Sequence, residues 1–210
     1  MMENVIQFYE NYDEEGRLFR SKSHLREYLT TIRYFDRLFE PGSRILDACA
    51  GTGRYAYYLA NKGHIVTACD LVERNVDIIK SKPDANKLAE ISVCNTTDLS
   101  RFESNSFDIV LCMGALYHLN SKELQEKVIS ECVRVCKSGG IVVLAYIIGN
   151  TSDDKYKDIF ISSKQDFRLI KTVKFFYQYH FSIPNKHFTC ELHKFRTYTL
   201  TFPYSGGILL

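Results

Sequence analysis

Residues 43–70 have the sequence SRILDACAGTGRYAYYLANKGHIVTACD. The apolar pair at 45–46 predicts a buried strand, and the small residues of 47–53 follow it as a turn. A helical apolar pattern comes next, and a second apolar run over 65–69 ends at Asp70. A strand, a glycine turn, a helix and a second strand within about thirty residues have the size of one βαβ unit.

The turn has the properties of a nucleotide-binding loop. Small residues let backbone N–H groups approach a ligand closely, and the start of the helix carries a partial positive charge. Asp70 is placed to accept hydrogen bonds from a ribose diol. The turn contains Gly51 and Gly53 but not the third glycine of a dinucleotide-binding fingerprint. Gly53-Arg54-Tyr55 does not match the Gly-Lys-Ser/Thr sequence that ends a P-loop. We therefore expect an adenosine-type ligand, the alternative being a glycine turn that binds nothing.

Composition limits the class of protein. A chain of 210 residues forms one domain, or one with a small appendage. A net charge of +2 argues against a nucleic-acid-binding surface as its main function. No apolar run is long enough to cross a bilayer, so we expect no membrane contact. The first residues lack a basic region followed by an apolar run, so we expect no signal peptide and a cytoplasmic location.

The seven cysteines predict reduced thiols in the core. Four of them lie in or beside apolar strand patterns, as small hydrophobic residues do: Cys49, Cys69, Cys94 and Cys112. Cys132 and Cys136 are one helical turn apart, but no second ligand pair has matching spacing. We therefore expect no metal site.

The rest of the chain predicts an α/β fold. Helical patterns cover 4–40, with a break at 13–16, and recur at 71–80 and 121–136, while apolar strand patterns occupy 91–94, 107–113 and 141–148. This alternation is typical of an open parallel sheet wrapped on both faces. Beyond Gly149, the polar stretch 150–157 predicts a loop, and 167–181 and 187–203 predict antiparallel strands.

The decisive stretch resembles motif I of the class I S-adenosylmethionine-dependent methyltransferases. Asp47 fills the acidic position, Gly51 and Gly53 the second and third glycine positions, and Cys49 stands in place of the first glycine. Three later segments are similar to the family's adenine loop, motif IV and the segment before the fifth strand: 94–96, 107–119 and 134–142. The N-terminal run is similar to a bacterial small-molecule-type branch of the family.

The resemblance implies a Rossmann-like methyltransferase fold: a mostly parallel seven-stranded sheet with helices on both faces and an antiparallel C-terminal strand pair. Residues 1–42 would form a helical lid and 43–210 the domain that binds S-adenosylmethionine. The implied cofactor-binding residues are Asp47, Cys49, Ala50, Gly51, Gly53, Asp70, Leu71, Asn95, Thr96 and Met113.

Candidate catalytic residues follow the fourth strand, at the edge where ligands bind in open α/β sheets. His118 is the first candidate for a base or an acceptor-orienting group, and Tyr117 is the second. The alternative for His118 is a helix-start histidine satisfied by backbone. Tyr12 and Arg17 lie at the break between the N-terminal helices and are candidates for substrate binding together with Tyr117 and His118, whereas helix packing is favoured for Tyr9.

The expected function is methyl transfer to a small-molecule acceptor. Only about twenty residues separate the fifth strand from the next predicted strand, so a cap over the substrate should be small or absent. This leaves open a non-catalytic cofactor-binding protein that acts as a partner subunit, and the C-terminal strands could support a homodimer. The turn argues against an NAD or nucleotide-sugar oxidoreductase. An RNA or protein methyltransferase should have a more basic surface or a recognition appendage.

Overall fold

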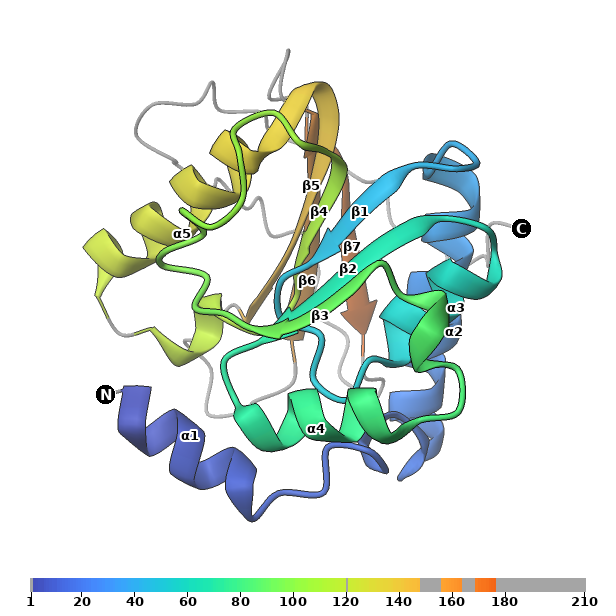
Figure 1. The fold of residues 1–210 in the computed structure, drawn as a ribbon, viewed down its shortest axis with the longest axis vertical. Coiled ribbons are helices and arrows are strands. Elements are labelled where there is room, and N and C mark those ends of the chain that lie inside the picture. The colour runs from blue at the N-terminus through green and yellow to red at the C-terminus, as the bar shows by residue number, and fades with distance from the viewer. Residues whose placement is uncertain (1, 120, 148–155, 164–168, 177–210) are drawn as a thin grey trace, which may run out of the picture.

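The computed structural model describes residues 2–119, 121–147, 156–163 and 169–176 (Figure 1). They form a seven-stranded sheet in the order β3-β2-β1-β4-β5-β6-β7. The first five strands are parallel, and β6 and β7 are antiparallel to their neighbours. The strands are β1 (Arg44–Asp47), β2 (Ile65–Asp70), β3 (Glu90–Val93), β4 (Phe107–Cys112), β5 (Cys136–Ile147), β6 (Tyr156–Ser163) and β7 (Leu169–Phe176).

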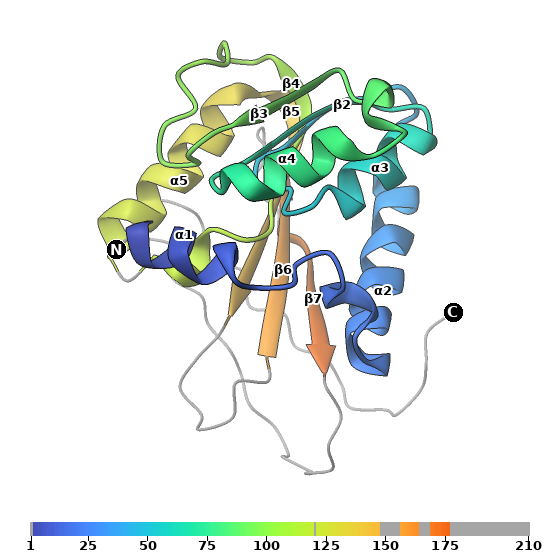
Figure 2. The same ribbon diagram turned by 60° about the horizontal axis from the view of Figure 1, so that its bottom comes forward.

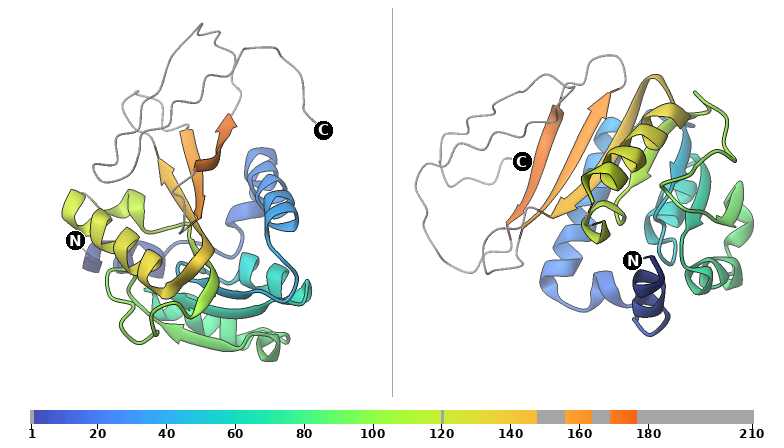
Figure 3. Two further views of the ribbon diagram at one scale, coloured as in Figure 1. Left: turned by 90° about the horizontal axis from the view of Figure 1, so that it is seen from above. Right: turned by 90° about the vertical axis from the view of Figure 1, so that its left-hand side faces the viewer.

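Helices pack on both faces of the sheet, as the strand–helix alternation predicts (Figure 3). One hydrophobic cluster joins the sheet to α2, α3 and α4, and a second joins the opposite face to α5. The helices are α1 (Met2–Glu10), α2 (Lys22–Leu38), α3 (Arg54–Asn61), α4 (Glu73–Ser81) and α5 (Lys122–Val135). Three short 3₁₀ turns are also described: η1 (Arg17–Phe19), η2 (Ala85–Lys87) and η3 (Leu116–His118).

Serine side chains cap the starts of two helices. The Ser21 side chain accepts a hydrogen bond from the His24 N–H at the start of α2, and Ser121 does the same for Leu124 at the start of α5. Between α1 and η1, residues 11–16 form the expected break. The strand order reverses between β1 and β4, and in open α/β sheets ligands bind at the carboxyl ends of the strands at such a point.

The fifth strand begins earlier than the sequence predicts. Phe107 of β4 pairs with Cys136 of β5, and the next pair is Ile109 with Ile141. Residues 137–140 of β5 are therefore extra residues that form a bulge. Gly139 adopts a φ of 79° there. The Lys137 Nζ atom lies 2.7 Å from Asp108 Oδ1. The glycine pair therefore shapes a bulge at the start of β5 and does not end α5.

The strands after β5 also differ from the expectation. β6 pairs with β5. Its first two residues, 156–157, were expected to be loop, and no strand was predicted for residues 158–163. It follows β5 after the eight residues 148–155. β7 falls inside the predicted strand 167–181, and the predicted strand 187–203 lies outside the described residues.

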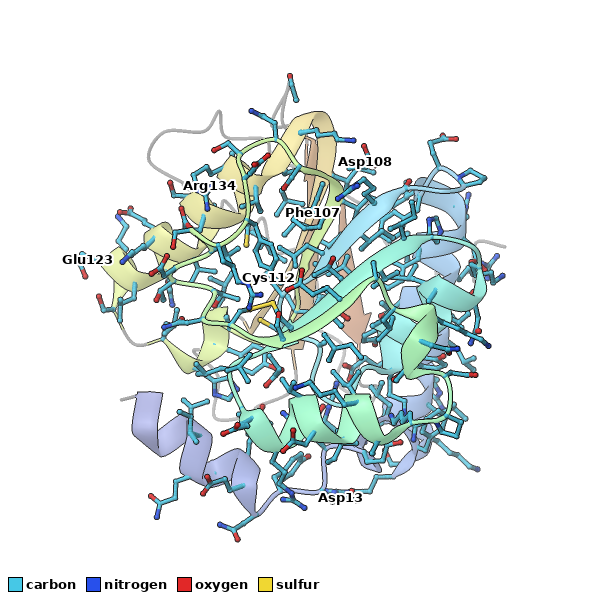
Figure 4. All side chains as sticks on the ribbon, in the orientation of Figure 1. Asp13, Phe107, Asp108, Cys112, Glu123 and Arg134 are labelled. Atoms are coloured by element: carbon cyan, nitrogen blue, oxygen red, sulfur yellow. A yellow bond between two sulfur atoms is a disulfide. The ribbon has the colours of Figure 1, made fainter. Side chains whose placement is uncertain are left out.

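The cysteines are not all reduced. A disulfide joins Cys69 to Cys94 across the ends of β2 and β3, because the parallel pairing brings their Cα atoms to 5.6 Å. Figure 4 shows this bond in the interior, and the same hydrophobic cluster contains Cys112. Cys49, Cys112, Cys132 and Cys136 are reduced. The expectation of reduced thiols is therefore wrong for Cys69 and Cys94, because sequence separation concealed their proximity.

Candidate cofactor and methyl-transfer site

The glycine turn sits at the carboxyl ends of β1 and β2. The Ala50 N–H donates to the Cys69 carbonyl at 3.0 Å, and the Gly53 N–H donates to the Ala50 carbonyl at 2.8 Å. Gly51 and Gly53 have φ values of 53° and 83°, in the left-handed region that favours glycine. The turn is therefore a tight loop between β1 and α3, with its backbone at the ligand-binding edge of the sheet.

Asp70 ends β2, and its carboxylate holds the glycine turn. Its Oδ2 atom accepts from the Gly51 N–H at 2.8 Å. Its Oδ1 atom accepts from the Val72 N–H at 2.9 Å and from the Asn75 side chain at 3.1 Å. Burial raises the pKa of Asp70, although these three donors favour the carboxylate. A carboxylate has about four lone-pair sites, so these contacts leave capacity for a ribose hydroxyl.

Asp47 lies at the end of β1 and is only 1% exposed. Burial, and then the neighbouring charge of Asp70, raise the pKa of Asp47 to about 7, while a hydrogen bond from the Cys49 N–H opposes the rise. Its Oδ2 atom is buried and has no hydrogen-bond partner among the described residues. An unsatisfied buried carboxylate oxygen is costly, so this position fits a ligand that brings a cation or a donor.

Cys49 packs where β1 and β4 approach each other. A side-chain carbon placed on Gly114 would lie 3.1 Å from Cys49 Cβ, and the Cys49 and Cys112 sulfur atoms are 3.8 Å apart. The Cys112 neighbour and burial raise the pKa of the Cys49 thiol. Cysteine is therefore accommodated in place of the first glycine because Gly114 leaves room for it. Met113 is partly buried and packs against the core on the side of α3.

The loop after β3 is shaped by its own side chains. Asn95 Oδ1 accepts from both the backbone N–H and the hydroxyl of Thr97, each at 2.9 Å. Thr96 is buried, and Leu71, at the facing end of β2, is partly buried. The Asn95 side-chain oxygen, expected to meet a base edge, is used in an Asx turn. Adenine contacts in this loop remain a prediction.

His118 meets a residue that sequence reasoning assigned to helix packing. The Tyr9 Oη atom lies 3.0 Å from His118 Nε2, and the two rings meet edge to face. Burial and nearby Glu14 raise the pKa of Tyr9 to about 12. Burial likewise holds the pKa of Tyr117 well above its ordinary value. Both tyrosines therefore keep their protons at neutral pH in the ligand-free protein, and the catalytic role of Tyr117 remains a prediction.

The break after α1 lies at the same edge of the sheet. Figure 4 shows Phe107 and Asp108 at one end of β4 and Cys112 at the other, on the side of the molecule where Asp13 lies. Figure 2 shows α1 crossing this side close to α4 and α5. The N-terminal segment therefore lies beside the loops that follow β1 and β4, since Glu14 is close to Gly51 and Tyr9 contacts His118. A lid role for residues 1–42 remains a prediction.

Arg17, a candidate for substrate binding, forms ion pairs with two carboxylates. Its guanidinium binds Glu14 Oε1 at 2.8 Å and Glu27 Oε1 at 3.2 Å. Burial disfavours this charge, but the two carboxylates outweigh burial and keep the pKa of Arg17 above its ordinary value. Two anions already pair with Arg17 in the ligand-free protein, and its role in substrate binding remains a prediction. Tyr12 stacks on Phe8, with ring centroids 5.2 Å apart.

Sequence reasoning missed Tyr9, Glu14 and Asn75. The Asn75 side chain reaches Asp70 from the first turn of α4, a contact that the five-residue spacing in the sequence allowed. Tyr9 and His118 are 109 residues apart, so no local pattern predicted their contact. The break at 13–16 was the available signal for Glu14, because side chains in a helix break can face a ligand edge.

Comparison with known proteins identifies the domain. A family model described as a methyltransferase domain matches residues 46–144. These residues form a class I S-adenosylmethionine-dependent methyltransferase domain. The match covers the glycine turn, Asp70 and the loop after β4, and S-adenosylmethionine is the cofactor of this family. The resemblance inferred from motif I is therefore confirmed, and so is the Rossmann-like α/β fold.

Individual relatives of the methyltransferase domain are distant. A probable tRNA methyltransferase 9B of Mus musculus is 29% identical over 113 residues, which cover 54% of this chain and 24% of the mouse protein. A ubiquinone biosynthesis O-methyltransferase of Coxiella burnetii is 28% identical over 109 residues, covering 52% and 45%. The chain thus spans less than half the length of either curated relative. The solved structure of PH0226 from Pyrococcus horikoshii shares the fold, with 18% identity, a TM-score of 0.55 and coverage of 73% and 78%.

None of the helices described is long and apolar enough to cross a membrane. Within the same part of the chain, no group of three or more histidine, cysteine, aspartate or glutamate side chains could hold a metal ion.

Proposed function

We propose that this protein transfers a methyl group from S-adenosylmethionine to a small-molecule acceptor, and that His118 orients or deprotonates that acceptor. The observation that carries the proposal is the contact between Tyr9 and His118 at 3.0 Å. It places a histidine under the α1 segment at the same edge of the sheet as Asp47, Asp70 and the glycine turn. A site covered by the protein's own helix is better suited to a small acceptor than to a large one.

S-adenosylmethionine brings a methyl group already activated by its sulfonium, so the protein chiefly aligns the acceptor. Of this chain's residues, Asp70 would hold the ribose and Asp47 would face the amino-acid end. Tyr117, which keeps its proton, would position the acceptor. His118 would take a proton from acceptors that carry one. The ribose role of Asp70 and the roles of Tyr117 and His118 are part of the proposal.

The curated relatives differ in the acceptors that their names state. The Coxiella relative is named as a ubiquinone biosynthesis O-methyltransferase, whereas the mouse relative is named as a tRNA methyltransferase. A net charge of +2 over the whole chain favours the small acceptor, because RNA binding usually requires a strongly basic surface. A tRNA acceptor is therefore the competing outcome of the test.

The test measures S-adenosylhomocysteine released when the full chain is mixed with S-adenosylmethionine and an acceptor. The panel contains small phenols, amines, carboxylic acids and thiols, with bulk tRNA as a separate arm. We expect release with at least one small acceptor. Transfer to tRNA alone would overturn the small-molecule assignment. Binding of the methyl donor without transfer to any acceptor would favour the non-catalytic partner subunit.

The role of His118 is tested on the acceptor found. His118→Gln should lower turnover by about a hundredfold, the usual contribution of a positioned base, and leave affinity for S-adenosylmethionine within about twofold. Tyr58→Phe is the matched control, because Tyr58 donates to Asp36 at the surface, away from this edge. If turnover and cofactor affinity fall together in His118→Gln, His118 is a structural residue.

A further inference from the structure

The segment between α1 and η1 is clamped onto the glycine turn. Glu15 Oε1 binds Arg54 Nη2 at the start of α3 at 2.8 Å, and Glu15 Oε2 binds Lys82 Nζ, after α4, also at 2.8 Å. Lys82 donates in addition to the Thr52 carbonyl within the turn at 2.7 Å. One carboxylate thus ties the N-terminal segment to both helices that flank the cofactor loop.

Glu14, the neighbour of this anchor, lies directly over Gly51. A side-chain carbon placed on Gly51 would be 3.2 Å from Glu14 Cγ and 3.3 Å from its Oε1 atom. The Glu14 side chain is 14% exposed, and Arg17 holds its Oε1 atom. Because the Gly51 N–H donates to Asp70, the same glycine contacts two carboxylates that come from distant parts of the chain.

Charge at this edge is mainly negative. The carboxylates of Asp47, Asp70, Glu14, Glu15 and Glu27 outnumber the cations. Arg17 pairs with Glu14 and Glu27, and Arg54 and Lys82 pair with Glu15. Asp47 adds the independent observation: it is 1% exposed, it interacts with Asp70, and its Oδ2 atom has no partner among the described residues. Buried carboxylates are stabilised by a cation, so this arrangement fits a positively charged group of a ligand.

We propose that Glu14 acts with Asp47 to bind the ammonium group at the amino-acid end of the methyl donor. The inference rests on the proposed function, because it takes the donor's ribose to lie at Asp70. A ligand that extends from Asp70 across the turn toward Tyr117 and His118 must pass beside Gly51, where Glu14 lies. The bound donor would thereby fix the segment that follows α1. Because α1 carries Tyr9, this would also hold Tyr9 against His118.

The experiment is a calorimetric titration of the full chain with two ligands. S-adenosylhomocysteine has the amino-acid end, whereas methylthioadenosine keeps the adenosine and the sulfur but lacks that end. Wild-type protein should bind both. Glu14→Gln should weaken S-adenosylhomocysteine binding about tenfold or more, the scale of a lost charge-assisted hydrogen bond, and change methylthioadenosine binding less than twofold. Glu10→Gln, an exposed change of equal charge in α1, should alter neither affinity.

Each other outcome decides the question. Equal weakening for both ligands would make Glu14 a structural residue, and unchanged or tighter S-adenosylhomocysteine binding would remove it from the site. Wild-type protein that binds neither ligand would overturn the cofactor assignment itself. If Glu14→Gln does not fold, Glu14→Asp is the replacement variant, because it keeps the negative charge on a side chain shorter by one methylene. In that variant too, weaker binding of S-adenosylhomocysteine with unchanged binding of methylthioadenosine supports the proposal. Equal weakening for both ligands, or unchanged binding of S-adenosylhomocysteine, overturns it.

Discussion

Asp47 is buried at the end of β1 beside Asp70, and its pKa of about 7 means that the cofactor-free protein holds a proton there that the unfolded chain releases near pH 4. The unfolded state therefore binds fewer protons between pH 4 and 7, and stability falls as pH rises through this range. The same carboxylate, when ionised, favours a cationic ligand. Asp47 thus lowers the stability of the cofactor-free protein, and its ionised carboxylate favours the binding of a cationic ligand.

Replacing Asp47 by Asn tests this trade-off. Asp47→Asn should raise the free energy of unfolding relative to wild type, by little at pH 4 and by up to about 4 kcal/mol above pH 7. The variant should also bind S-adenosylmethionine more weakly at pH 8. Urea unfolding at several pH values measures the first effect and calorimetry the second. The same pH dependence of stability in both proteins would contradict the account of Asp47.

The residues of motif I could be predicted from sequence because their roles are local. A turn between a strand and a helix needs small residues, and an acid ending the next strand lies beside it by the geometry of one βαβ unit. The contacts of Tyr9 with His118 and of Glu14 with Gly51 could not be predicted, because these N-terminal residues lie far in sequence from their partners. Such contacts depend on how α1 is placed against the sheet.

At the scale of elements, the start of β5 shows how a short motif was misassigned. A glycine pair after a helix is a common stop signal, so residues 137–140 predict the end of α5. The structure instead begins β5 at Cys136 and places the pair in a bulge against β4. β6 was missed for a similar reason, since a polar beginning concealed the strand that pairs with β5 over 141–147.

Gly140 should be the least replaceable residue of this bulge. A side-chain carbon there would lie 2.5 Å from the Asp108 carbonyl oxygen and 2.7 Å from the Cys136 sulfur. Gly140→Ala should therefore lower the free energy of unfolding by about 3 kcal/mol, as overpacking against backbone does. Gly42→Ala is the control: its φ is 75° but no atom lies within 4 Å, so backbone strain of about 1 kcal/mol is expected. Equal losses in a denaturant titration would contradict the bulge.

At the scale of the whole molecule, the sheet brings three separate parts of the chain to one edge. β1 and β2 supply Asp47, the glycine turn and Asp70, the loop after β4 supplies Tyr117 and His118, and the N-terminal segment supplies Tyr9 and Glu14. The parallel order of β2, β1 and β4 made the first two parts predictable, because it places their carboxyl ends side by side. Helices were predicted for the N-terminal segment, but its contacts with His118 and Gly51 were not.

The most direct test of this account is a calorimetric titration of the full chain with S-adenosylmethionine and, separately, with NAD. Wild-type protein should bind S-adenosylmethionine with a dissociation constant in the micromolar range and should not bind NAD. Asp70→Ala should weaken S-adenosylmethionine binding by roughly 1.5–3 kcal/mol, the scale of hydrogen bonds to a charged acceptor, and Asp77→Ala, an exposed change in α4, should not. Binding of NAD, or unchanged affinity in Asp70→Ala, would contradict the assignment of the cofactor site.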